Sequence, residues 1–179
     1  MSEDVIRTGR DLAYQGTVLK VYKDHMKFSN GNTEEWDFIH HDGAAAVIPV
    51  MEDGKILMVK QYRNALERDT LEIPAGKLDD PNEEGIVCAA RELKEEIGAT
   101  IVNEPILLGN VISDSGLTGN RVDVYLVEIE SFQQNQLVHE GIKQIIEIPV
   151  NKMDDWIRQG KIDDGFSLSA YALYQSHIK

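Results

Sequence analysis

Three glutamates, Glu92, Glu95 and Glu96, lie at spacings that place them on neighbouring turns of a helix. Residues four apart share a helix face, so Glu92 and Glu96 would repel each other by roughly 0.2–0.5 kcal/mol. A divalent cation such as Mg²⁺ turns that repulsion into attraction, because it binds carboxylate oxygens and usually a phosphate as well. The spacing would therefore suit a metal site whose substrate carries phosphate, although such a helix taken alone is more often a solvated face.

The segment that carries these glutamates, residues 76–98, has the periodicity of an amphipathic helix. Its apolar positions at helical spacing are Ile86, Ala90, Leu93 and Ile97. Gly98 predicts the end of the helix, as the glycine that follows its last turn. The helix could begin at either of two places. Asp80, which precedes a proline, has the sequence of an N-terminal cap, and a later start near Glu84 also fits.

Glutamate pairs on helices are also common on solvated faces, and Arg91 with Glu95 would form an ordinary ion pair across one turn. The wider pattern favours a functional site. Gly76, Glu83 and the run Arg-Glu-Leu-Lys-Glu-Glu-Ile-Gly that ends at Gly98 resemble the signature of the Nudix hydrolase family. The match is complete from Glu83 onward, whereas six residues, not the family's five, separate Gly76 from Glu83.

The resemblance implies which residues hold the metal. It gives Glu92 and Glu96 as the principal ligands of Mg²⁺, with Mn²⁺ as an alternative ion, and Glu95 as an assisting carboxylate. The backbone carbonyl of Ala75 is a further ligand, and Arg91 anchors the helix through a salt bridge. Divalent ions at such a site offset the charge of a diphosphate and lower the pKa of a bound water.

Two segments resemble the ADP-sugar pyrophosphatase branch of the family, residues 59–63 and residues 71–76. The resemblance implies that Arg63 contacts the substrate phosphates, although a lone arginine at a hairpin end is commonly solvated. We count Gly76 and Glu83 with the substrate-binding residues. Glu83 could lie near the metals or pair with Arg91, or it could equally be only a cap of the helix.

Trp36 alternates with Phe38 along an expected strand of the N-terminal region. Packing between strands accounts for most tryptophans of this kind. Residues 1–42, however, resemble the extension that ADP-ribose pyrophosphatases exchange across a homodimer, where an aromatic side chain stacks on the adenine. Stacking of a base on an aromatic ring contributes roughly 1–3 kcal/mol. The resemblance thus implies a homodimer and a substrate-binding role for Trp36.

Several residues could accept the proton of the attacking water. Relatives often use a glutamate on a loop before the penultimate strand, and Gln144 stands opposite it here. Glu140 is a candidate substitute, and His139 is another. A metal-bridging hydroxide positioned by Glu95 or Glu96 is the third option.

The order of expected elements fits a mixed α/β fold. By resemblance, this is the Nudix α/β/α sandwich over residues 43–179, preceded by the antiparallel β extension over residues 1–42. An Asn-Gly pair within residues 29–32 predicts a hairpin. The expected strands are 17–28, 33–39, 45–50, 55–60, 71–73, 105–112, 122–129 and 142–148. The other expected helices are a short one capped by Asn151 and a final one over residues 167–178, with Leu168, Tyr171, Ala172 and Tyr174 as core contacts.

The composition limits the partners and the compartment. A formal net charge of -13 disfavours binding to nucleic acid or to an anionic membrane. The apolar runs are too short to span a bilayer, and the N-terminus is too polar for a signal peptide. Cys88 is the single cysteine, which excludes a disulfide within the chain and fits the cytoplasm. A small buried helix position explains it better than a catalytic thiol does.

These observations lead to one main hypothesis. The chain is expected to hydrolyse the diphosphate bond of a nucleoside diphosphate sugar, namely ADP-ribose, to AMP and ribose 5-phosphate with Mg²⁺. The polar loop at residues 113–120, which could be a plain turn, departs from many relatives at Gly119 and Asn120, as Gln144 does elsewhere. These departures leave GDP-mannose or another sugar nucleotide as an alternative. An inactive nucleotide-sensing domain is the alternative of another class, and the retained helix glutamates argue against it.

Overall fold

The computed structural model describes residues 4–133 and 141–178. They fall into two compact units, and we describe each by itself. The N-terminal unit comprises the chain up to Asp42 together with Ile112–Asn120, and the larger unit comprises Gly43–Val111 and the chain from Arg121 onward. Within the described residues, the helices are too short or too polar to cross a membrane.

The N-terminal unit is an antiparallel sheet of β1 (Val5–Gln15), β2 (Lys20–Phe28) and β3 (Thr33–His40), in that order. Strands β2 and β3 confirm the expected hairpin, and Gly31 takes a φ of 88° in its turn, which suits a residue without a side chain. Strand β1 was not expected from the sequence. Its register against β2 shifts near Gly9 and again further along, so the two-residue alternation that marks a strand is broken.

Among the described residues, the larger unit is built on a seven-stranded mixed sheet with the order β10-β5-β4-β9-β8, in which β6 pairs with β5 and β7 pairs with β4. Strands β4 and β9 are parallel, and the pairs of β5 with β4, β6 and β10 are antiparallel. The strands are β4 (Ala44–Met51), β5 (Lys55–Arg63), β6 (Arg68–Glu72), β7 (Ala75–Lys77), β8 (Ile106–Ile112), β9 (Arg121–Ile129) and β10 (Ile142–Pro149). The expected mixed α/β class is therefore confirmed.

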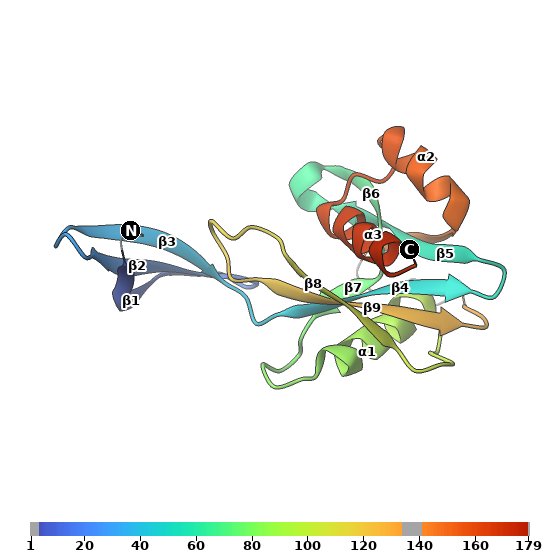
Figure 1. Ribbon diagram of the computed structural model, residues 1–179, viewed down its shortest axis with the longest axis horizontal. Coiled ribbons are helices and arrows are strands. Elements are labelled where there is room, and N and C mark those ends of the chain that lie inside the picture. Colours follow the sequence, from blue (N-terminus) through green and yellow to red (C-terminus); the bar gives the residue numbers. More distant parts are fainter. Residues whose placement is uncertain (1–3, 134–140, 179) are drawn as a thin grey trace. The chain divides into compact units, whose positions relative to one another are not determined.

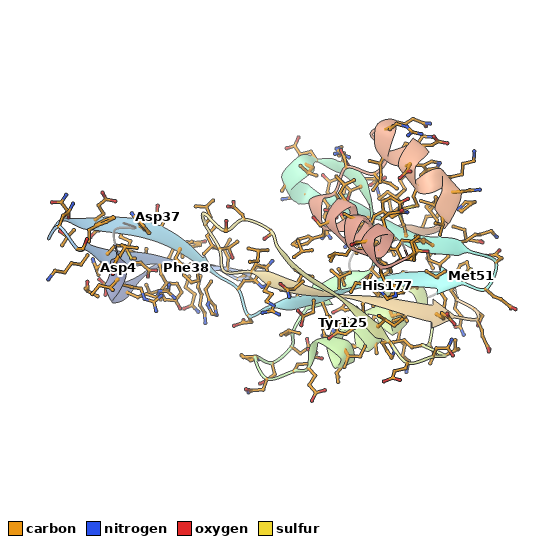
Figure 2. All side chains as sticks on the ribbon, viewed as in Figure 1. Asp4, Asp37, Phe38, Met51, Tyr125 and His177 are labelled. Atoms are coloured by element: carbon orange, nitrogen blue, oxygen red, sulfur yellow. The ribbon has the colours of Figure 1, made fainter. Side chains whose placement is uncertain are left out.

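Side chains of β4 alternate between two apolar cores, one on each face of this sheet. Ala45 and Val47 pack in the core that contains helix α1 (Gly85–Ile97), while Ile48 packs in the core that contains helix α3 (Gly165–His177). Figure 1 shows α1 and α3 on opposite sides of the sheet. Tyr125 of β9, labelled in Figure 2, packs against the α1 core. The larger unit thus has the layers of an α/β/α sandwich.

Helix α1 takes the later of its two expected starts. It begins at Gly85 after Glu84, whose side chain makes no capping hydrogen bond. Asp80 instead closes a turn of its own, because its carboxylate accepts from the backbone N–H of Asn82 at 2.8 Å. The expected end is confirmed, since Gly98 follows the helix with a φ of 64°.

The apolar face of α1 agrees with the expected one at Leu93 and Ile97, and Ile86 packs against the same core while partly exposed. Cys88, Ala89, Leu93 and Ile97 are buried in the core. Ala90 is exposed, so its assignment to the core was wrong. Alanine is found on both faces of helices and therefore marks the buried stripe less clearly than a larger side chain does.

The two remaining helical expectations also needed correction. The short helix α2 spans Met153–Arg158, and Asn151 lies in the 3-10 turn η3 (Val150–Lys152) before it rather than at its cap. A further 3-10 turn, η1 (Asn64–Leu66), follows β5. The final helix, α3, is capped by Asp164, whose carboxylate accepts from the backbone N–H of Ser167 at 2.8 Å.

The buried face of α3 includes Tyr171 and Tyr174, as expected, and Leu168 packs against the same core while partly exposed. Ala172 is exposed, and Ala170 is the alanine that packs in the core. The helix starts two residues earlier than expected, at Gly165.

Candidate active site

Two of the three helix glutamates are buried side by side on α1. Glu92 is 5% exposed and Glu96 is 4% exposed, whereas the side chain of Glu95 is 56% exposed. Glu92 accepts a hydrogen bond from Nη1 of Arg91 at 2.5 Å, and Glu96 accepts one from the backbone N–H of Ala75 at 3.2 Å. Carboxylates are seldom buried unless they are paired or hold a cation. The buried pair is therefore the part of the helix that could hold a metal ion.

Gly76 of β7 leaves the space that the Glu92 carboxylate occupies. A Cβ atom at position 76 would lie 1.9 Å from Oε1 and 2.0 Å from Cδ of Glu92. No side chain fits at such a distance, so glycine is required here for close approach rather than for an unusual φ. The buried carboxylates of α1 are thus set directly against the backbone of Ala75 and Gly76.

Arg91 connects α1 to the loop before it. Its Nη2 donates to Oε2 of Glu83 at 3.2 Å and to the carbonyl of Lys77 at 3.0 Å, and Nε lies 3.3 Å from the carboxylate of Asp79. Glu83 also accepts from the backbone N–H of Asp79 at 2.8 Å. Glu83 therefore pairs with Arg91 and closes the loop that carries the extra residue, and its side chain does not cap the helix.

The charges around Arg91 shift its pKa and that of Glu83. Burial lowers the pKa of Arg91, but hydrogen bonds to Glu83 and Glu92 outweigh burial, so the pKa lies above its usual value. Arg91 in turn lowers the pKa of Glu83, with help from the backbone N–H of Asp79. The pair is therefore charged at neutral pH and holds the first turns of the helix to the loop.

The donor set suits a hard divalent cation. Within residues 4–133 and 141–178, no group of three or more His, Cys, Asp or Glu side chains is arranged to hold a metal ion. Glu92 and Glu96 are two buried carboxylates, and the backbone of Ala75 lies beside them, with its N–H bonded to Glu96. Mg²⁺ is commonly bound by one or two carboxylates, with water and substrate phosphates as its other ligands. The residues present therefore fit such an ion, with Glu95 at the exposed edge.

Arg63, at the end of β5, lies in the same unit and is held by a glutamate that the sequence did not single out. Its Nε donates to Oε1 of Glu72 at 2.8 Å, and its Nη2 donates to Oε2 of Glu72. The hydrogen bond to Glu72 raises the pKa of Arg63 against the effect of burial, and the charges of Asp164 and Glu96 add to the rise. Of the two buried carboxylates on α1, Glu96 is the one whose charge contributes to the raised pKa of Arg63.

Cys88 does not have the properties of a nucleophile. Its thiol is buried under the site and lies 3.3 Å from the carbonyl of Lys77. Burial raises the pKa of Cys88 to about 11. The side chain is therefore a neutral thiol at physiological pH, as the sequence analysis expected of a small buried helix position.

Trp36 lines a hollow in the N-terminal unit. The hollow has a volume of about 680 Å³ and is lined by Trp36, Phe38, Asp24 and the loop Ser115–Gly119, among others. Trp36 is 43% exposed, and its indole Nε1 donates to Glu34 at 2.9 Å. Packing between strands therefore leaves much of its surface open.

Phe38 and the loop form the fixed part of this hollow. The Arg10 guanidinium lies 3.9 Å from the centre of the Phe38 ring and donates to Asp24 at 2.5 and 2.6 Å. The backbone N–H of Ile39 donates to the carbonyl of Leu117 at 2.8 Å, which fastens the loop to β3. The loop at residues 113–120 is therefore a part of this pocket and more than a plain turn.

Comparison with known proteins decides the family. The sequence model of the NUDIX domain matches residues 40–163. The chain belongs to the Nudix family. Two similar proteins are the ADP-ribose pyrophosphatase of Bacillus subtilis, 30% identical over 95% of this chain and 91% of its own length, and the methanol dehydrogenase activator of Bacillus methanolicus, 31% identical over 97% and 92%.

A solved structure supports the fold of this Nudix chain. The crystal structure of an ADP compounds hydrolase superposes with a TM-score of 0.83 over 98% of this chain and 95% of that one. At 19% identity, this likeness concerns the fold alone. Together with the relatives, the family match makes the protein a Nudix hydrolase that resembles ADP-ribose pyrophosphatases. Nudix hydrolases generally use divalent metal ions.

Two buried residues beside Arg63 were not found from the sequence, and the predictions for the general base are not tested by the structure. Glu72 and Thr70 of β6 are buried polar side chains behind Arg63. A glutamate between two apolar residues of a strand was the signal that could have revealed Glu72. Glu140, proposed as the base, and His139 lie outside the described residues, and Gln144 is an exposed residue of β10.

Proposed function

We propose that this Nudix hydrolase cleaves the diphosphate bond of a nucleoside diphosphate sugar, and that ADP-ribose is its substrate. The observation that carries the proposal is the buried pair of Glu92 and Glu96 against the backbone of Ala75 and Gly76, with Arg63, whose pKa the charge of Glu96 helps to raise. Cleavage of a diphosphate requires a metal ion and a fixed positive side chain to offset the phosphate charges. The two glutamates offer ligands for the metal ion, and Arg63 supplies the fixed positive charge.

The hydrolysis adds one water across the bridging oxygen. A new P–O bond forms between the water oxygen and one phosphorus, the bond from that phosphorus to the bridging oxygen breaks, and AMP and ribose 5-phosphate leave. A Mg²⁺ ion at this site would supply positive charge against the phosphate oxygens and would lower the pKa of the attacking water. Glu92 and Glu96 would hold the ion, and Arg91 keeps their helix against the loop. Arg63 would bind a phosphate oxygen and offset its charge.

The net charge of -13 makes these local cations necessary. A polyanionic substrate is repelled by the chain as a whole, so it must be drawn in by the metal and by arginines at the site. The name of the Bacillus subtilis relative supports ADP-ribose as the substrate. That relative covers nearly the whole chain, including the N-terminal unit, which supports a shared use of both units.

The N-terminal unit supports two further parts of the proposal, a base-binding surface and a homodimer. Strand β1 is an edge strand of its sheet and exposes apolar side chains at Ile6, Leu12 and Tyr14, at 58, 52 and 60%. Exposed apolar side chains on an edge strand favour association with another chain. We propose that a second copy of this chain covers β1.

Trp36→Ala should raise KM for ADP-ribose about tenfold and lower kcat much less. The reason is the loss of stacking on the adenine, which contributes roughly 1–3 kcal/mol per base. Steady-state kinetics of the purified variant measure both constants. Trp36→Phe keeps a flat aromatic ring and should recover most of the affinity, and an unchanged KM in Trp36→Ala would remove the stacking role.

A substrate panel tests the proposed function itself. The purified chain is incubated with ADP-ribose, GDP-mannose or UDP-glucose, with Mg²⁺ or with Mg²⁺ and excess chelator, and the products are separated by chromatography. We expect AMP and ribose 5-phosphate from ADP-ribose, with turnover lost in chelator. Faster turnover of GDP-mannose would move the substrate to another sugar nucleotide, and binding without turnover would contradict hydrolysis.

A further inference from the structure

A buried polar cluster lies behind Arg63 on the hairpin of β5 and β6. The register of this hairpin pairs Gln61 with Thr70 and Val59 with Glu72, which puts Arg63, Thr70 and Glu72 on one face. Thr70 is 4% exposed and Glu72 is 7% exposed. The guanidinium of Arg63 extends back along this face to reach Glu72, and 45% of its own side chain stays exposed.

The carboxylate of Glu72 is held by hydrogen bonds from Arg63 and from Thr70. The carboxylate accepts two hydrogen bonds from Arg63 and one from the Thr70 hydroxyl at 2.5 Å. Burial raises the pKa of Glu72, but these hydrogen bonds outweigh it, so the pKa lies below its usual value and the group is charged. A charged, two-point contact fixes the plane of a guanidinium more firmly than a single bond does.

The backbone next to Glu72 is also fixed. The hydroxyl of Ser167, at the start of α3, accepts from the backbone N–H of Ile73 at 3.0 Å and donates to Asp164 at 2.8 Å. Ser167 is fully buried. This contact ties the segment between Glu72 and Ala75 to helix α3, so that Glu72 is a rigid support.

Glu72 engages Nε and Nη2 of Arg63, and the structure gives no hydrogen bond between Nη1 and a described residue. The guanidinium therefore has its Nε and Nη2 edge fixed by Glu72, while 45% of the Arg63 side chain stays exposed. An arginine fixed in this way binds a phosphate with less loss of side-chain entropy than a free one.

We propose that Glu72, supported by Thr70, is a positioning residue that holds the Arg63 guanidinium in one orientation for a phosphate oxygen of the substrate. This inference rests on the proposed function, because it assigns the residue that orients its phosphate ligand. A purely structural ion pair is the competing explanation, since buried pairs are also found far from active sites. The two explanations differ in whether Glu72 acts through Arg63.

A double-mutant cycle with inorganic pyrophosphate separates them. Binding of pyrophosphate in the presence of Mg²⁺ is measured by calorimetry for the wild type, Glu72→Gln, Arg63→Ala and the double variant. We expect Glu72→Gln to weaken binding about tenfold, as for a hydrogen bond to a charged group, and to have almost no effect once Arg63 is alanine. An equal loss in both backgrounds, or no loss with Arg63 present, would overturn the positioning role.

Two further variants protect the test from a folding defect. Thr70→Val removes one hydrogen bond to Glu72 without changing a charge, and it should weaken binding a few-fold by the same route through Arg63. If Glu72→Gln does not fold, the cycle of Thr70→Val with Arg63→Ala gives the answer. Glu147→Gln is the matched control, because it removes a glutamate paired with Lys55 at the other end of β5 and should leave binding unchanged.

The cycle also distinguishes failure of this inference from failure of the proposed function. Pyrophosphate binding does not require the protein to hydrolyse a sugar nucleotide. If the panel gives no turnover while the cycle shows coupling between Glu72 and Arg63, the proposed function fails and the positioning role stands. If the wild type does not bind pyrophosphate, the inference is overturned whatever the panel shows.

Discussion

Glu96→Gln should lower kcat for sugar-nucleotide hydrolysis about 10³-fold and leave the fold intact. Glu96 is buried and accepts a hydrogen bond from the backbone of Ala75, so its carboxylate is fixed where the metal is expected. A metal ion contributes several kcal/mol of charge stabilisation to a transition state, and about 4 kcal/mol corresponds to this loss. The amide keeps the size of the side chain but loses the charge that attracts a divalent cation.

The measurement is kcat at saturating Mg²⁺, with the thermal unfolding midpoint as the check on folding. Glu104→Gln provides the control, because Glu104 is an exposed glutamate outside the site and should keep wild-type activity. If Glu96→Gln turned over at the wild-type rate, the metal role of Glu96 would be wrong, and the burial of its carboxylate would need another explanation.

Gly76→Ala should be nearly as damaging to activity as loss of Glu92 itself. The added Cβ would lie 1.9 Å from Oε1 of Glu92, so the carboxylate must move from its place beside β7. Because Glu92 is buried and bonded to Arg91, its movement also disturbs the contact that anchors the helix. We expect kcat to fall at least about 100-fold, because a misplaced ligand weakens binding of the metal ion and places the ion wrongly for the reaction.

Gly165→Ala is the matched control for this substitution. Gly165 is the first residue of α3, and a Cβ there would have nothing within 4 Å. The Gly165→Ala variant should keep full activity. Its stability should change only slightly, because alanine at an unstrained position lowers the conformational entropy of the unfolded chain. Full activity in Gly76→Ala, with Glu92 still near β7 in a crystal structure, would contradict the tight packing of the carboxylate on this strand.

The helix and its glutamates could be predicted from the sequence because their information is local. The spacing of Glu92 and Glu96 and the stop at Gly98 depend only on the geometry of a helix. The helix start could not be settled in the same way. Asp80 has the sequence of a cap but closes a turn instead, because Glu83 is taken by Arg91 and the backbone of Asp79.

The parts that the sequence did not reveal depend on contacts between distant segments. Strand β1 is set by pairing with β2 through an irregular register, which hides its alternation. Ala90 and Ala172 were assigned to the core although both are exposed, since alanine does not distinguish the faces of a helix. The proposed role of Glu72 follows only from its hydrogen bonds to Arg63, nine residues away, and to Thr70.

Substrate choice is the property that depends most on residues far apart in the sequence. The arrangement of Glu92 and Arg63 favours a substrate that carries a diphosphate and binds together with a metal ion. Many sugar nucleotides have these properties in common. The proposed recognition of the nucleotide's adenine rests on Trp36 and the loop Ser115–Gly119, which belong to the N-terminal unit. The substrate panel is therefore needed beside the variants.

We propose that Glu92 and Glu96 together hold the divalent ion. Titration of Mn²⁺ into the protein in the presence of inorganic pyrophosphate, followed by the electron paramagnetic resonance signal of the free ion, measures this directly. We expect the double variant Glu92→Gln with Glu96→Gln to bind Mn²⁺ about 100-fold more weakly or worse, and to unfold at a temperature similar to that of the wild type. Mn²⁺ affinity equal to that of the wild type in this folded double variant would contradict the proposal.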